Sequence, residues 1–244
     1  MQPVDEPALD ERLVRDRFAA LTARLRAAAE AAGRDPDGFR IVAVTKGFGV
    51  EVVEVAAAAG LPRLGENRVQ EALPKMEAHP ELEWHLIGHL QSNKARPAAE
   101  AFAWIHSVHG IPLLERLEAL GHDAARAPRL LLQVNLSDEA SKSGWHAEAF
   151  AQAIRPGGEL VRALGRMRAV RVEGLMTIAR FGASPSEARD TFARLRHLRD
   201  RLREASGLAL PELSMGMTAD AEAGVSEGAT LVRVGTALFG PRPA

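Results

Sequence analysis

Lysine is rare in this chain, and one of its lysines directly follows an expected strand, a position at which reactive side chains are common. The chain has 31 basic side chains, of which only four are lysines, at positions 46, 75, 94 and 142. Because arginine stays protonated and cannot attack a carbonyl, a lysine in such a chain is favoured where a primary amine is needed. Lys46 directly follows the apolar and β-branched residues 41–45. It is therefore a candidate Schiff-base lysine, and a snorkelling lysine at a strand end is the alternative.

Two late segments have the composition of phosphate-binding loops. Each combines a glycine with a hydroxyl side chain, in the pairs Ser214 with Gly216 and Gly235 with Thr236. Glycine lets backbone N–H groups approach an anion closely, and the hydroxyls can add further donors. The alternative is ordinary strand-to-helix turn chemistry, with Thr218 as the N-cap of a helix near residues 219–227.

Eight short apolar runs alternate with helical patterns and must position these residues. The expected strands are residues 41–45, 63–65, 84–88, 104–107, 130–134, 172–177, 212–214 and 229–233. An amphipathic helix over about the first 32 residues precedes them and ends at Gly33. We predict a single α/β domain over residues 1–244, a (β/α)8 TIM-type barrel with an extra N-terminal helix. A doubly wound sheet is less consistent, since no G-x-G-x-x-G turn follows the first run.

Composition excludes several classes of function. The chain has no cysteine and no tyrosine, so disulfides, thiol nucleophiles, cysteine metal sites and phenolic bases are absent. A net charge of −1 and a pI near 6.7 argue against nucleic-acid binding. No apolar run reaches the ~18 residues of a membrane span, and no signal peptide is evident, so a cytoplasmic location is expected. His85 and His89 fall on a segment expected to be a strand running into a loop, where four residues span roughly 13 Å, so no metal site is predicted.

The ordered motifs together resemble a known family. They occupy residues 42–46, 65–71, 84–94, 133–135, 141–144, 174–176, 213–217, 232–236 and 239–240. This set resembles the YggS/PROSC family of pyridoxal 5′-phosphate (PLP) homeostasis proteins, whose fold is similar to the N-terminal domain of alanine racemase.

The resemblance implies a cofactor site. Lys46 would hold PLP as a Schiff base, and Arg233 would face the pyridine nitrogen. Asn67 and Lys142 would lie near the ring and its phenolic oxygen. The phosphate would be cradled by the glycines and hydroxyls of the two late segments, Ser214, Gly216, Gly235 and Thr236.

The same residues favour a cofactor carrier over an enzyme. An arginine at the pyridine nitrogen weakens the ring as an electron sink, and racemisation needs an acid/base on each face of the substrate. We therefore expect no catalytic residue and little or no turnover, although residual racemase-type activity stays open. The expected partners are PLP and apo-enzymes that need it, and a monomer is expected because the second domain of alanine racemase is missing. The alternatives are a one-domain PLP-dependent amino-acid racemase and a class I aldolase.

Overall fold

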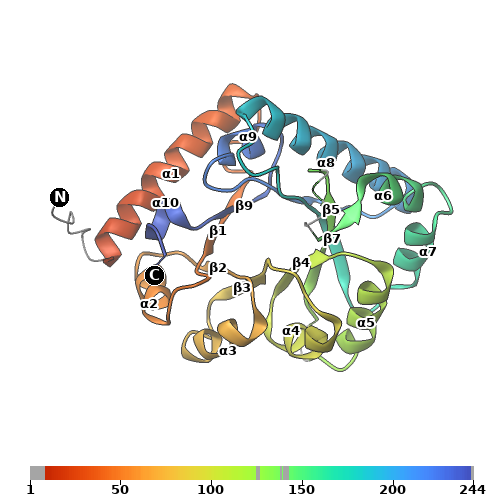
Figure 1. Ribbon diagram of the computed structural model, residues 1–244, viewed down its shortest axis with the longest axis horizontal. Helices are drawn as coiled ribbons and strands as arrows, with labels where there is room; N and C mark the ends of the chain where they lie inside the picture. Colours follow the sequence, from red (N-terminus) through yellow and green to blue (C-terminus); the bar gives the residue numbers. More distant parts are fainter. Residues whose placement is uncertain (1–8, 125–126, 138, 140–142, 243–244) are drawn as a thin grey trace.

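A ring of parallel strands forms the centre of the computed structural model, which describes residues 9–124, 127–137, 139 and 143–242 (Figure 1). The ring strands are β1 (Arg40–Val44), β2 (Arg63–Glu66), β3 (Glu83–Leu86), β4 (Trp104–Val108), β5 (Arg129–Asn135), β7 (Arg171–Met176), β8 (Glu212–Ser214) and β9 (Leu231–Val234). Neighbouring strands are hydrogen-bonded in the order β4-β3-β2-β1-β9-β8-β7-β5, and β4 also pairs with β5. The predicted eight-stranded parallel barrel is therefore confirmed.

The pairing of β1 with β9 joins the early and late parts of the chain. Its register places Ala43 opposite Val234, so the residues that follow the two strands lie side by side. The two-residue strand β6 (Trp145–His146), which was not predicted, pairs with the end of β5 outside the ring.

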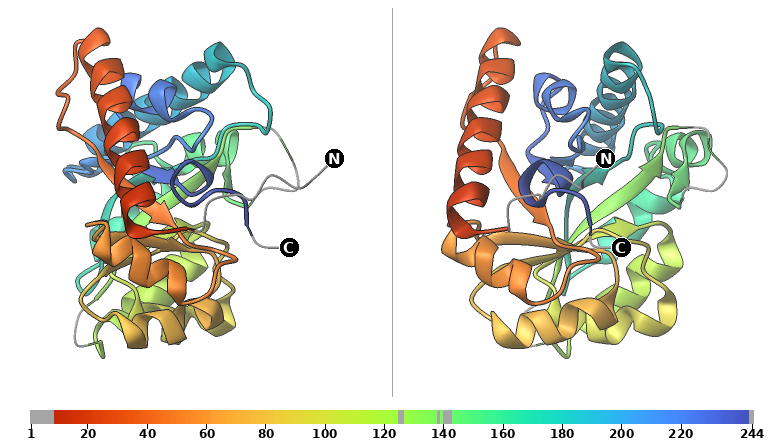
Figure 2. Two further views of the ribbon diagram at one scale, coloured as in Figure 1. Left: turned by 90° about the vertical axis from the view of Figure 1, so that its left-hand side faces the viewer. Right: turned by 60° about the vertical axis from the view of Figure 1, so that its left-hand side comes forward.

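Helices cover the outside of the ring. The predicted N-terminal helix is confirmed as α1 (Glu11–Ala31), which lies along the outer edge of the barrel beside α9 and α10 (Figure 2). The other helices are α2 (Glu51–Ala58), α3 (Val69–Ala78), η1 (Ser92–Lys94), α4 (Ala95–Ala101), α5 (Ile111–Gly121), α6 (Ala147–Ala153), α7 (Glu159–Arg166), α8 (Pro185–Ser206), α9 (Ala221–Ser226) and α10 (Thr236–Phe239). None of the helices in the described part of the chain is long and apolar enough to cross a membrane.

The core has two parts of unequal size. Most buried apolar side chains lie in a single large cluster that joins the strands to the surrounding helices. A second, small cluster consists of Val42, Trp104, Leu131, Met176 and Leu231. These residues come from five different ring strands, and Trp104 shares its face of β4 with a buried histidine, His106. The barrel interior therefore combines a small apolar cluster with polar side chains, where branched apolar residues usually dominate.

A capping box begins the longest helix, α8. The Ser184 hydroxyl accepts a hydrogen bond from the Glu187 backbone N–H at 3.3 Å, and the Glu187 carboxylate accepts one from the Ser184 N–H at 2.7 Å. We expect Ser184→Ala to lower the free energy of unfolding by about 1 kcal/mol, because the Glu187 backbone N–H loses its hydroxyl acceptor. Urea unfolding followed by circular dichroism measures this change. Ser184→Asn should retain most of the stability, and equal losses in both variants would contradict the capping role.

Candidate functional site

Lys46 lies two residues beyond β1, at the carboxyl end of the barrel strands. Its side chain is half-buried, and burial is the main cause that lowers the pKa of its amine. The positive charges of Arg242 and Arg233 lower the pKa further, whereas the carboxylate of Glu66 opposes them. A lowered pKa increases the neutral fraction of the amine near pH 7, which is the form that attacks a carbonyl.

Gly235 and Thr236 lie beside the end of β1. A Cβ atom on Gly235 would stand 3.0 Å from the carbonyl oxygen of Val44, so a larger residue would push these two segments apart. Thr236 is exposed and begins the short helix α10. The β1–β9 pairing therefore brings the expected phosphate loop and Lys46 to one place on the barrel rim.

Arg233 links the expected loop that contains Gly235 to the one that contains Gly216. Its backbone N–H donates to the carbonyl oxygen of Gly216 at 3.0 Å, and Gly216 has a φ of +90°, which favours glycine. The buried guanidinium donates through Nη1 to the Ser214 hydroxyl and through Nη2 to the Thr177 carbonyl oxygen, the latter at 2.9 Å. Burial lowers the pKa of Arg233 to about 10, so the guanidinium remains charged at neutral pH.

The interpretation of Thr218 as an N-cap was wrong. Helix α9 begins at Ala221, after Asp220, and the Asp220 carboxylate accepts a hydrogen bond from the Met217 N–H at 2.5 Å. The turn that follows Gly216 is therefore held by a carboxylate and not by a threonine hydroxyl.

Asn67 follows β2, the other neighbour of β1. A Cβ on Gly88 would stand 2.2 Å from the Asn67 carbonyl oxygen, so glycine at 88 allows the loops after β2 and β3 to approach. Seven of the eight expected cofactor residues thus lie at the ends of four adjacent strands, β2, β1, β9 and β8. The eighth, Lys142, lies outside the described residues.

A buried ion pair at the end of β1, next to Lys46 in the chain, was not predicted. Lys75 Nζ lies 2.6 Å from Glu66 Oε1 and donates to the Thr45 carbonyl oxygen at 3.0 Å. The Thr45 hydroxyl donates to the same Glu66 oxygen at 2.7 Å. These three residues are at most 4% exposed, and Glu66 Oε2 has no hydrogen-bond partner among the described residues. The network fixes the end of β1, where the chain continues into Lys46.

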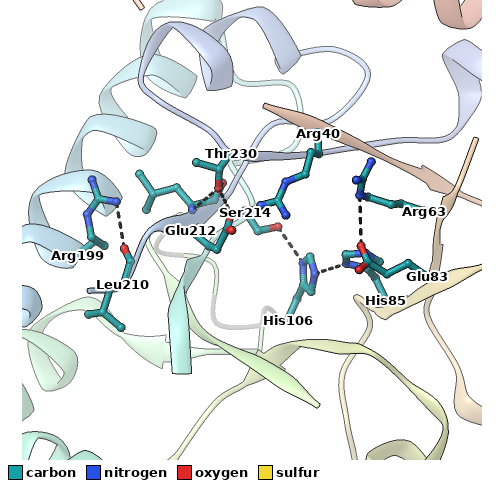
Figure 3. Close-up of polar contacts among 11 residues, drawn as sticks. Arg40, Arg63, Glu83, His85, His106, Arg199, Leu210, Glu212, Ser214 and Thr230 are labelled. Carbon is teal, nitrogen blue, oxygen red and sulfur yellow. Dashed lines mark hydrogen bonds and ion pairs between the residues drawn. The ribbon is translucent and has the colours of Figure 1, made fainter. Parts of the chain in front are cut away.

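A line of polar side chains was also missed. His85 Nδ1 lies 2.9 Å from His106 Nε2, and His106 Nδ1 lies 2.9 Å from the Ser214 hydroxyl oxygen (Figure 3). His85 Nε2 contacts the Glu83 carboxylate at 3.2 Å. The available signal was the period of two along neighbouring strands, which puts both histidines inside the barrel. Among the described residues, no group of three or more His, Asp or Glu side chains could hold a metal ion.

Comparison with known proteins identifies the family. The sequence model of one protein family, the N-terminal domain of alanine racemase, matches residues 17–243. A pyridoxal phosphate homeostasis protein from Pseudomonas aeruginosa is 43% identical over 234 residues, which cover 94% of this chain and 96% of that protein. The chain belongs to the family of pyridoxal phosphate homeostasis proteins. The resemblance seen in the sequence motifs is thus confirmed.

Solved structures of this family and of a more distant one have the same fold. PipY from Synechococcus elongatus, in the structure described as having PLP bound, is 39% identical with a TM-score of 0.79, covering 93% of this chain and all of that one. Alanine racemase from Corynebacterium glutamicum is 18% identical with a TM-score of 0.67, covering 96% of this chain and 62% of that one. The similarity to alanine racemase concerns the fold alone.

Arg242 offers a test of the electrostatics around Lys46. A Cβ on Gly47 would stand 2.8 Å from Arg242 Cδ, so the Arg242 side chain lies against the loop that follows Lys46. Arg242→Gln removes a charge that lowers the pKa of Lys46, so that pKa should rise and the neutral amine fraction at pH 7 should fall. We expect slower attachment of an aldehyde to Lys46 and a pH midpoint of attachment shifted upward, measured by stopped-flow absorbance. Arg242→Lys should leave the midpoint unchanged, and a downward shift in Arg242→Gln would contradict this account.

Proposed function

We propose that this protein binds pyridoxal 5′-phosphate covalently on Lys46 and serves PLP homeostasis with little or no turnover. The observation that carries the proposal is the position of Lys46, whose amine has a lowered pKa and stands beside the Gly235 loop and the Arg233 guanidinium. The whole barrel, residues 1–244, would act as one cofactor-binding domain.

The residues at the carboxyl end fit the chemical groups of PLP. When bound, PLP supplies an aldehyde, with which a neutral lysine amine condenses to a Schiff base with loss of one water. The backbone at Gly216 and Gly235, with the Thr236 hydroxyl, would bind the phosphate. Asn67 and Lys142 would contact the ring and its phenolic oxygen. Arg233 would face the pyridine nitrogen, and its guanidinium donates a hydrogen bond to the Ser214 hydroxyl.

Two features support binding without turnover. Arg233 is a buried cation that donates hydrogen bonds, and such a group opposite the pyridine nitrogen disfavours its protonation and so weakens the ring as an electron sink. The chain also contains no tyrosine, so no phenol can serve as a second acid/base.

The proposed role is to hold PLP, limit free aldehyde and deliver the cofactor to apo-enzymes that need it. The expected setting is the cytoplasm, with the protein as a monomer that binds neither nucleic acid nor membrane. The name of the Pseudomonas aeruginosa relative and the PLP-bound PipY structure support this role. The alternative, a one-domain PLP-dependent racemase, retains the same cofactor site.

Peptide mapping tests the proposal directly. The protein is incubated with PLP, reduced with borohydride and digested, and the mass of each lysine-containing peptide is measured. We expect the reduced cofactor on the peptide that contains Lys46. A label confined to other lysines, or no label, would overturn the proposed site. Proton exchange at the α-carbon of D- and L-alanine in D2O, followed by NMR, should stay at the uncatalysed rate, and steady exchange would instead favour the racemase.

A further inference from the structure

A continuous line of hydrogen bonds runs through the barrel interior and ends at Arg233. It begins at Glu83, the first residue of β3, and passes through His85, His106 and Ser214 to the guanidinium. Its contacts join side chains from β3, β4, β8 and β9, and Figure 3 shows the part from Glu83 to Ser214. Apart from the partly exposed Glu83, every member is at most 3% exposed. These side chains are therefore out of contact with bulk water.

The two ends of the line fix the direction of every hydrogen bond in it. Arginine has donors only, so Arg233 must donate to the Ser214 oxygen. At the other end, the hydrogen bond with His85 lowers the pKa of Glu83 to about 2, so this carboxylate is ionised at neutral pH and only accepts. Burial lowers the pKa values of both His85 and His106, so each ring is neutral and carries a single N–H.

Only one set of proton positions satisfies both ends. His85 must carry its proton on Nε2 to donate to Glu83, so its Nδ1 accepts. His106 must then carry its proton on Nε2, and its Nδ1 accepts from the Ser214 hydroxyl. The Ser214 hydroxyl hydrogen is thereby directed at His106, and its lone pairs receive the Arg233 donor. This hydrogen is not available to a phosphate, which differs from the role expected for it from the sequence.

We propose that His85 and His106 are positioning residues that, through Ser214, hold the Arg233 guanidinium in one orientation at the carboxyl end of the barrel. If either ring moved its proton to Nδ1, the Ser214 hydroxyl would face an N–H on one side and a guanidinium N–H on the other. The Ser214 oxygen can accept from both, but its hydrogen would then have no acceptor in this line. The Arg233 contact would also lose the polarisation that donation to His106 gives the hydroxyl oxygen. The importance of this orientation for a bound cofactor rests on the proposed function.

The packing around the two rings supports a fixed geometry. His85 is stacked on Trp104, with ring centroids 5.7 Å apart and an interplanar angle of 4°. His106 meets the edge of the same indole, at 6.2 Å and 71°. An apolar interior would fill this space with fewer partners to satisfy, since barrel interiors are usually built from branched apolar residues. This line of hydrogen bonds is formed by only one arrangement of protons. It is therefore better explained by the need to hold the Arg233 guanidinium than by a contribution to stability.

The proton positions can be measured on the protein without any cofactor. In protein labelled with ¹⁵N-histidine, two-dimensional NMR at neutral pH distinguishes an Nε2–H ring from an Nδ1–H ring and from an imidazolium. We expect both His85 and His106 to be neutral and protonated on Nε2, with the signals assigned from the single variants His85→Gln and His106→Gln. An Nδ1–H form or an imidazolium at either ring would overturn the proposal. This result does not depend on whether PLP binds.

Two variants at His106 then test the positioning role. Glutamine carries an N–H donor and a carbonyl acceptor at a spacing close to that of the two ring nitrogens, whereas leucine carries neither. In His106→Leu we expect a weaker affinity for PLP, by about tenfold, and a shifted absorption band of the bound cofactor. In His106→Gln we expect both properties to stay near those of the parent protein. Affinity is measured by equilibrium dialysis and the band by absorbance.

A merely structural role predicts a different outcome. It would lower the thermal stability of His106→Leu and leave the band position and the affinity of its folded fraction unchanged, which would overturn the positioning role. If His106→Leu does not fold, His85→Leu with His85→Gln as its control makes the same comparison one residue farther from Arg233. Failure of PLP to attach to Lys46 in the parent protein would refute the proposed function and leave the NMR result to decide the hydrogen-bond direction.

Discussion

Replacing Lys75 with methionine is expected to lower the free energy of unfolding by about 3–5 kcal/mol, because it leaves the Glu66 carboxylate buried without its cation. The carboxylate is fully buried, and its oxygen Oε1 is shared between Lys75 and the Thr45 hydroxyl. Within the part of the chain that the structure describes, its other oxygen has no hydrogen-bond partner. Removal of Lys75 would leave one neutral hydrogen bond to compensate a buried charge. Urea unfolding followed by tryptophan fluorescence and circular dichroism measures the loss.

The double variant Glu66→Leu with Lys75→Met is the matched control. Replacing both members of a buried ion pair with apolar side chains is often close to neutral. We therefore expect the double variant to be more stable than Lys75→Met, despite having one more substitution. If Lys75→Met were as stable as the parent protein, or if the two losses simply added, the ion pair would not have the role assigned to it.

Replacing Lys46 with arginine is expected to abolish covalent attachment of PLP. A guanidinium stays protonated at any pH at which the protein is folded, so it cannot condense with the aldehyde. Borohydride-reducible cofactor should fall from about one molecule per chain to below a few per cent of that value. The intact mass of the reduced protein measures this directly, and circular dichroism checks that the barrel has formed.

Lys94→Arg provides the control for that experiment. Lys94 ends the short helix η1, away from the ends of β1 and β9, and its replacement should leave the label unchanged. A Lys46→Arg variant that kept the full label would show that a different amine holds the cofactor. Loss of the label in both variants would point to a general effect on folding.

The strands and the rim residues could be predicted because each depends on local sequence. The runs at 41–45 and 130–134 are apolar enough to indicate buried parallel strands, and eight such runs indicate a barrel. Because the functional face of such barrels is the carboxyl end of their strands, Lys46 and Gly235 could be placed at the same face without knowledge of the register. Arg233 was placed there only through the family resemblance. Short elements such as α4 and β6 were missed because seven or two residues are too few to show a period.

The buried polar contacts could not be predicted, because they join residues that are distant in sequence. Lys75 illustrates the difficulty. The scarcity of lysine favoured a role in amine chemistry for a retained lysine, yet the structure places Lys75 in a buried ion pair. His85 and His106 are likewise 21 positions apart and meet only because β3 and β4 are neighbours. Their hydrogen-bond direction depends on Glu83 and Arg233, which are still farther apart in the chain.

The pairing of β1 with β9 has a consequence for how the protein is made. Lys46 leaves the ribosome early, but its neighbours Ser214, Arg233 and Gly235 are among the last described residues to be synthesised. During most of translation the reactive amine therefore lacks the loops that would select a phosphate beside it, and non-local contacts of this kind form slowly. A growing chain would meet free aldehydes without selectivity, and specific capture of the cofactor can begin only when the ring has closed.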